Sequence, residues 1–218
     1  MNILEPYLAA TQLCDFDAES LIRVKAAEIA QGCADERERF ERVYRYVKEL
    51  PYGLEDWDVK ASETLRKGWG MCSGKANLLV AMSRALSIPA RYRVFRIAAE
   101  GRLLRWAVEQ EEGLGAQLGE LPLEQDHVDC EAYLEGRWRQ YDPSRDSPLE
   151  EGFMALGIPL ERVPVADADG EVRYNILASI DDWARRRQER RRFRTGRQAL
   201  FARVNEQLEK IRAVSRDL

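Results

Sequence analysis

Cys72 is the residue of this sequence best placed to act as a nucleophile. It follows the glycine-containing turn Trp69-Gly70-Met71 and opens a segment whose apolar residues repeat at helical spacing. The N-terminus of a helix carries about half a positive charge and has free N–H groups, which favour a thiolate and can hold an oxyanion. Cys72 is therefore a candidate nucleophile. The alternative is a buried structural cysteine, which is the more usual state of a single cysteine.

His127 is the only histidine of the chain, so any mechanism that needs an imidazole must use it. Residues 128–134 and 137–141 read as two strands joined by Glu135-Gly136, a hairpin signal. If the residues on either side of this turn face each other, His127 and Asp142 project from one face as diagonal neighbours. A carboxylate there can orient the imidazole and stabilise its cation. The alternative is a surface histidine near a turn aspartate.

Several helices and one more strand must position these residues. The spacing of apolar residues and the breaks at glycine and proline predict five helical segments. They run from Asp17 or Ser20 to Gly32, from Asp35 to Leu50, from Ser62 to Gly68, from Cys72 to Leu86, and from about Ile180 to the C-terminus with an interruption near Gly196. Ala90–Ala98 alternates and is rich in β-formers, which predicts a strand. Residues 143–175 are expected to be rich in loops, and residues 99–125 give no readable pattern.

Charge is distributed unevenly along the chain. Residues 1–184 contain 22 Lys and Arg against 34 Asp and Glu, whereas residues 185–218 contain 12 against 4. Eight of the arginines lie between Arg185 and Arg197. A basic run of this kind can bind nucleic acid or an anionic surface. Because the rest of the chain repels phosphate, we favour a basic helix docked on the acidic body of the protein or exposed to solvent.

Composition limits the class of protein. A chain of 218 residues with 45% hydrophobic and 33% charged residues is typical of a globular protein with a sizeable core. Four widely spaced cysteines argue against a disulfide framework, and a single histidine excludes a multi-histidine metal site. The sequence lacks the apolar run of a membrane span and the basic start of a secretory signal. We therefore expect a cytoplasmic protein without a membrane partner.

Two stretches of the sequence resemble the transglutaminase-like superfamily. The first runs from Ala61 to Arg91. It matches the family pattern of a small-residue turn, G-x-C, an apolar helix and R-A-x-G-I-P-A-R, with Ser87 at the position of the glycine. The second runs from His127 to Pro143 and is similar to H-x-W-x-E-x-Y-x-x-G-x-W-x-x-x-D-P. Both stretches stand in the family's order and separation, and together they cover about residues 35–145.

The resemblance implies a papain-like α+β core, in which a helix bearing the nucleophile packs on an antiparallel sheet. It implies Cys72 as nucleophile, His127 as general base and acid, and Asp142 as the residue that orients the histidine. Trp69 or Tyr52 is a candidate for the oxyanion donor, although each is more often a core residue. Asp129 replaces the usual aromatic residue, and we expect it on the catalytic face opposite Asp142. A protonated His127 is then a candidate cation between the two carboxylates.

The resemblance also sets the functional expectation, which is cysteine-dependent acyl transfer on a peptide or protein amide. For a bacterial-type stand-alone domain we expect hydrolysis, with protein crosslinking through an amine as the alternative. A non-catalytic relative that binds protein or nucleic acid is a second alternative. We expect no cofactor and no metal, and the acidic stretch 167–170 is too short for a calcium loop. The expected organisation is an N-terminal helical extension (1–34), a catalytic core (35–178) and a basic C-terminal helical extension (179–218).

Overall fold

The computed structural model describes residues 3–18, 20–98, 124–189 and 197–216. The elements follow in this order: η1 (Glu5–Tyr7), α1 (Ser20–Ile29), α2 (Glu36–Glu49), α3 (Ala61–Lys67), α4 (Cys72–Ala85), β1 (Ala90–Ala98), β2 (Glu124–Leu134), β3 (Arg137–Tyr141), α7 (Ser147–Ala155), β4 (Asn175–Leu177), α8 (Asp181–Glu189) and α9 (Arg197–Arg216). This is the expected α+β class, a helical layer packed against an antiparallel sheet.

The sheet has the strand order β3-β2-β1-β4, and every neighbouring pair is antiparallel. The β2–β3 hairpin turns at Glu135 and Gly136, whose φ angles of 53° and 79° are both positive, as a two-residue hairpin turn of type I′ requires. Leu134 pairs with Arg137 and Cys130 with Tyr141, which confirms the predicted register. β2 continues past the end of β3, so His127 lies beyond the last paired residue of the hairpin.

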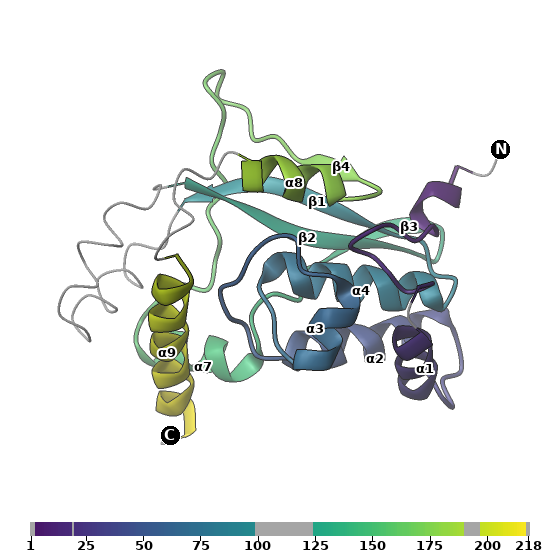
Figure 1. The fold of residues 1–218 in the computed structure, drawn as a ribbon, viewed down its shortest axis with the longest axis horizontal. Coiled ribbons are helices and arrows are strands. Elements are labelled where there is room, and N and C mark those ends of the chain that lie inside the picture. Colours follow the sequence, from purple (N-terminus) through teal and green to yellow (C-terminus); the bar gives the residue numbers. More distant parts are fainter. Residues whose placement is uncertain (1–2, 19, 99–123, 190–196, 217–218) are drawn as a thin grey trace.

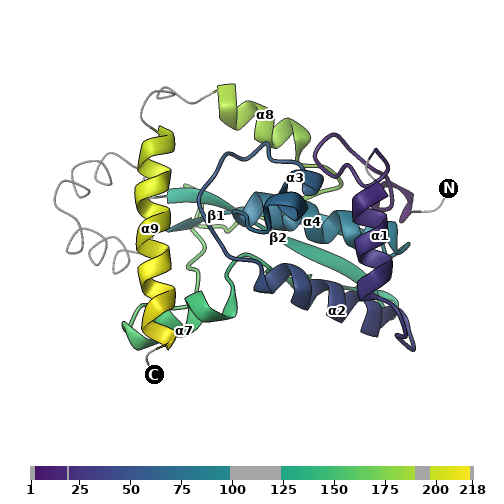
Figure 2. The same cartoon turned by 60° about the horizontal axis from the view of Figure 1, so that its bottom comes forward.

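Helix α4 is the centre of the fold. All its residues from Cys72 to Arg84 are buried, because one face packs on the sheet and the others on α1, α2 and α3 (Figures 1 and 2). Two polar anchors fix its position. Lys75 Nζ donates to the carbonyl oxygens of Lys48 and Leu50 at 2.9 and 2.5 Å, and Asn77 Nδ2 donates to that of Val59 at 2.9 Å. Burial lowers the pKa of Lys75 to about 7.

Helix α4 ends before Ser87, which adopts a φ of 63°. This left-handed conformation is strained for a residue with a side chain and favours glycine. It gives a physical reason for the glycine that the family places at this position.

Helices α7 and α9 form a second cluster at one end of the molecule (Figure 2). Leu149 and Phe153 of α7 pack there with Leu208 and Ile211 of α9. Gly152 allows the two helices to approach closely, since a Cβ at this position would lie 2.1 Å from the carbonyl oxygen of Ile211.

A Gly152→Ala substitution should therefore force α7 and α9 apart. We expect the free energy of unfolding to fall by about 1–3 kcal/mol, the usual cost of overpacking a core. Chemical denaturation of the purified variant measures it. Met154→Ala is the matched control, because Met154 lies on the same helix and is 58% exposed. Equal stability of the two variants would contradict the packing described here.

Some elements differ from the sequence-based expectation. Helix α7 lies within 143–175, which was expected to be rich in loops. Strand β4 begins at the last residue of this range, and η1 was not predicted. The predicted C-terminal helix is observed as α8 and α9, and its expected interruption near Gly196 falls outside the described residues. The pattern of 99–125 also remains untested, except that Glu124 and Gln125 belong to β2. None of the described helices combines the length and apolar character needed to cross a bilayer.

Candidate active site

Cys72 is the first residue of α4, where the backbone N–H groups lack partners within the helix. Glu55, from the loop after α2, caps this helix end: its Oε1 accepts from the Met71 N–H at 2.9 Å, and its other oxygen pairs with Lys67. Gly74 makes room for the cap, since a Cβ there would lie 2.6 Å from the same Oε1. Glu55 was not singled out in the sequence, because only the fold brings it to α4.

Removing this cap should loosen the start of α4. We expect Glu55→Ala to lower the free energy of unfolding by about 1–3 kcal/mol, because the buried Met71 N–H loses its acceptor. Glu55→Gln keeps an acceptor oxygen and should lose less. Denaturant titration of both variants tests this expectation. If the two variants lose equal stability, the Lys67 ion pair rather than the hydrogen bond to Met71 is the important contact.

His127 and Asp142 form a pair, with Nε2 of the ring 3.0 Å from Oδ2 of the carboxylate. Phe95 packs edge-on against the ring, which is 3% exposed. Cys72, at the start of α4, lies close enough to His127 to raise the pKa of the ring. The sequence-predicted Cys72, His127 and Asp142 therefore lie close together, in that order.

The ring and the carboxylate shift each other's protonation. Burial lowers the pKa of His127, but the charge and hydrogen bond of Asp142 and the nearby Cys72 outweigh it, so the pKa is raised. Burial raises the pKa of Asp142, but His127, Arg162 and Ser144 outweigh it and hold this pKa well below its usual range. The pair therefore favours an imidazolium beside a carboxylate.

Two residues that the sequence analysis did not name complete the surroundings of Asp142. Its Oδ1 accepts from the backbone N–H and hydroxyl of Ser144 at 2.9 and 2.6 Å. Its Oδ2 accepts from Nη1 of Arg162 at 2.6 Å, and Nη2 of Arg162 donates to the Ser144 hydroxyl at 2.5 Å. Ser144 follows Asp142-Pro143 in the pattern of an Asx turn, which is a readable signal. Arg162 has none, because it stands in an irregular segment.

Asp129 pairs with a different cation from the expected one. It is 1% exposed, and it accepts two hydrogen bonds from Arg93 at 2.9 and 2.6 Å and one from Gln140 at 2.8 Å. Burial raises its pKa, and the charge of Asp142 adds to the rise. The cation that pairs with Asp129 is therefore Arg93 and not His127.

Tyr52 and Trp69 stand on adjacent segments before α4, which meet in a parallel bridge between Tyr52 and Gly70. Burial raises the pKa of Tyr52, and the nearby Cys72 raises it further. This places the phenol close to the thiol. The Trp69 ring packs against the Lys67 ammonium, 4.3 Å from its centroid, and against Gly53. Tyr52 thus interacts with Cys72, whereas the described contacts of the Trp69 ring are with Lys67 and Gly53.

The basic C-terminal segment is described only in part. Arg187 of α8 pairs with Asp126 and stacks over Trp57, and Arg185 pairs with Asp182. Residues 190–196, which contain four of the eight arginines of the run, lie outside the described residues.

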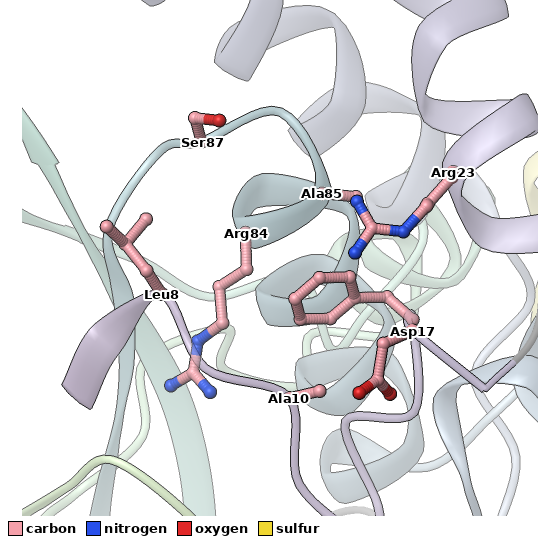
Figure 3. A pocket seen from close by; sticks show the side chains of 8 residues that line it. Leu8, Ala10, Asp17, Arg23, Arg84, Ala85 and Ser87 are labelled. Atoms are coloured by element: carbon pink, nitrogen blue, oxygen red, sulfur yellow. The ribbon is translucent and has the colours of Figure 1, made fainter. Parts of the chain in front are cut away.

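A cavity of about 380 Å³ opens at the other end of α4 from Cys72 (Figure 3). Arg84, Arg23 and Asp17 line it. The Arg84 guanidinium donates to the carbonyl oxygens of Ala9, Ala90 and Ala178, and Nη1 also lies 3.9 Å from Cys14 Sγ. These contacts occupy its N–H groups, so Arg84 has a structural role in joining α4 to the sheet and the N-terminal segment.

The fold and the site together define a papain-like arrangement, in which a cysteine at a helix N-terminus faces a histidine carried by an antiparallel sheet. The sequence matches the model of the transglutaminase-like superfamily over residues 23–143, more than half of the chain, and the protein belongs to this superfamily. No curated protein matches the chain.

The comparison with solved structures supports the fold through one neighbour and reports a second, weaker similarity. A "putative cysteine protease" from Cytophaga hutchinsonii is similar with a TM-score of 0.51 and 21% identity, over 82% of this chain and 52% of that one. The chain thus spans about half the length of that relative. A "putative protease" from Parabacteroides distasonis gives a TM-score of 0.42 and 12% identity, over 63% of this chain and 26% of that one.

Proposed function

We propose that the protein is a cysteine-dependent acyl-transfer enzyme that hydrolyses amide bonds in peptides or proteins. The observation that carries the proposal is the proximity of Cys72 to His127, whose Nε2 lies 3.0 Å from Asp142 Oδ2. A thiol, a base and an orienting acid in this order are the parts that nucleophilic catalysis needs. Membership of the transglutaminase-like superfamily supports the same chemistry.

In the proposed reaction, the Cys72 thiolate adds to the amide carbonyl carbon and the carbonyl oxygen becomes an oxyanion. N–H groups at the start of α4, with Tyr52 as a further donor, would stabilise this oxyanion. The C–N bond then breaks, and the imidazolium of His127 gives its proton to the departing amine. The thioester that remains is attacked by water, His127 takes the proton of that water, and a carboxylic acid leaves with the thiol restored.

The first test is whether Cys72 reacts selectively. We expect iodoacetamide at pH 6 to label Cys72, as mapped by peptide mass spectrometry. Burial raises the pKa of Cys14 to about 11 and that of Cys130 well above its usual value, so both thiols stay protonated. Cys33 is partly exposed and serves as the internal reference for labelling. Labelling of Cys72 no faster than that of Cys33 would refute the proposal.

The second test separates water from an amine as the acceptor of the acyl group. Peptide fragments released from a denatured protein substrate would support hydrolysis, and incorporation of dansylcadaverine into glutamine side chains would support crosslinking. A Cys72→Ala variant should show neither. A binding protein without activity would bind its partner equally well with and without this substitution.

A further inference from the structure

Arg162 and His127 bind the same oxygen of Asp142. Arg162 Nη1 lies 2.6 Å and His127 Nε2 lies 3.0 Å from Oδ2. Arg162 also reaches Ser144, whose hydroxyl and N–H hold the other oxygen of the carboxylate. The planar guanidinium thus joins Asp142 and Ser144 in one network, and its side chain is only 20% exposed.

The guanidinium has two opposite effects on the site. It keeps Asp142 ionised and fixed in orientation, which helps the carboxylate to hold the imidazole. Its positive charge also opposes that of a protonated His127, and its effect on the pKa of His127 is to lower it. Without Arg162, no positive charge beside Asp142 would offset its effect, and the pKa of His127 would rise.

Other ionisable groups around the pair are already matched or more distant. Asp129 on β2 is held by Arg93 of β1, and Cys72 approaches the ring from α4. The remaining groups that act on Asp142 come from α2, the loop after α2, α4, β2 and the segment after β3. They are Tyr44, Tyr52, Lys75, Cys130, and Arg145, which donates to the Leu160 carbonyl. Among the described residues, Arg162 is the arginine or lysine that binds the same Asp142 oxygen as His127.

We propose that Arg162 is a positioning residue of this site. By binding Asp142 and Ser144 together it fixes the carboxylate that faces His127, and its charge prevents that carboxylate from holding the imidazolium proton too tightly. His127 can then give this proton to a leaving amine. The inference rests on the proposed function, because it assigns Arg162 a part in the proton transfer of the same reaction.

The single histidine makes the test direct. Protein labelled with ¹⁵N in histidine gives the imidazole signals of His127 alone, and their pH titration reports its pKa. We expect Arg162→Met to raise this pKa by about one pH unit, because the charge of Asp142 is no longer shared. Arg162→Lys keeps the charge and should titrate close to the wild type. Arg162→Gln, which keeps a hydrogen-bond donor but no charge, replaces the methionine variant if the latter does not fold.

Arg173→Met is the matched control. Arg173 stands in the same segment but pairs with Asp167 and Asp169 at the surface, so its loss should leave the imidazole titration unchanged. If a folded Arg162→Met or Arg162→Gln variant has the wild-type titration, the inference is wrong. Iodoacetamide labelling of Cys72 in the wild type distinguishes the two proposals. Unreactive Cys72 counts against the proposed function, whereas reactive Cys72 with an unshifted imidazole counts against Arg162 alone.

Discussion

Replacing His127 with alanine is expected to slow the alkylation of Cys72 at pH 6 by about a hundredfold. Only the thiolate reacts, and an ordinary thiol is almost fully protonated at this pH. In the wild type, the raised pKa of His127 favours the cationic imidazole at pH 6. A neighbouring cation promotes the reaction of a cysteine with an alkylating agent. The rate should be measured with limiting iodoacetamide and mass spectrometry of the peptide that contains Cys72.

The variant also changes the dependence of the rate on pH. Without the imidazole, the alkylation rate of Cys72 should rise steadily between pH 6 and pH 9. The wild type should instead react well at the acidic end of this range. Met154→Ala, at an exposed site on α7, should behave like the wild type. A His127→Ala protein that alkylates at the wild-type rate would show that the imidazole does not activate the sulfur.

Replacing Arg212 with methionine is expected to lower the free energy of unfolding by about 3–5 kcal/mol. Arg212 of α9 donates two hydrogen bonds to Asp146 at 2.9 and 2.7 Å and one to the Tyr52 carbonyl at 2.6 Å. The side chains of Arg212 and Asp146 are 4% and 2% exposed. Loss of the guanidinium therefore leaves a buried carboxylate without its cation. Urea titration at pH 7 measures the effect.

The loss should shrink in acid. Burial raises the pKa of Asp146, but Arg212 and the Tyr52 N–H outweigh it, so the folded pKa lies below its ordinary value of 3.8. The stabilisation is then present above about pH 4 and disappears as the pH falls through the folded pKa. Lys210→Met removes an exposed cation from the same helix and should change stability by less than about 1 kcal/mol. A small effect of Arg212→Met at pH 7 would mean that the buried pair does not hold α9.

Local signals were sufficient to predict the central part of the fold. The Glu135-Gly136 turn fixed the hairpin register, and with it the shared face of His127 and Asp142, because side chains alternate along strands. The start of α4 at Cys72 followed from a glycine turn and a helical repeat. Strand β4 has three residues, which is too short for an alternating pattern. Helix α7 carried readable signals, since Asp146 caps it and Pro148 stands in its first turn.

Contacts that depend on the fold were not predictable. Arg162, Glu55 and Arg212 reach the site from segments distant along the chain, and an isolated arginine or glutamate has no spacing that indicates its partner. The partner of Asp129 was predicted wrongly for the same reason, because its contact also depends on the fold. The hairpin placed Asp129 opposite Asp142, but β1 pairs Arg93 with Asp129, and that pairing required the order of strands in the sheet.

Helix α9 holds the loop that lies beside Cys72, although α9 stands near the end of the sequence. Asn205 binds both the N–H and the carbonyl of Leu54, and Arg212 binds the carbonyl of Tyr52. The loop beside the thiol therefore takes its final form only after the last described helix has docked. During synthesis, Cys72 and His127 leave the ribosome well before Asn205 and Arg212. In a nascent chain, the sulfur and the imidazole are therefore made before the helix that holds the loop beside them.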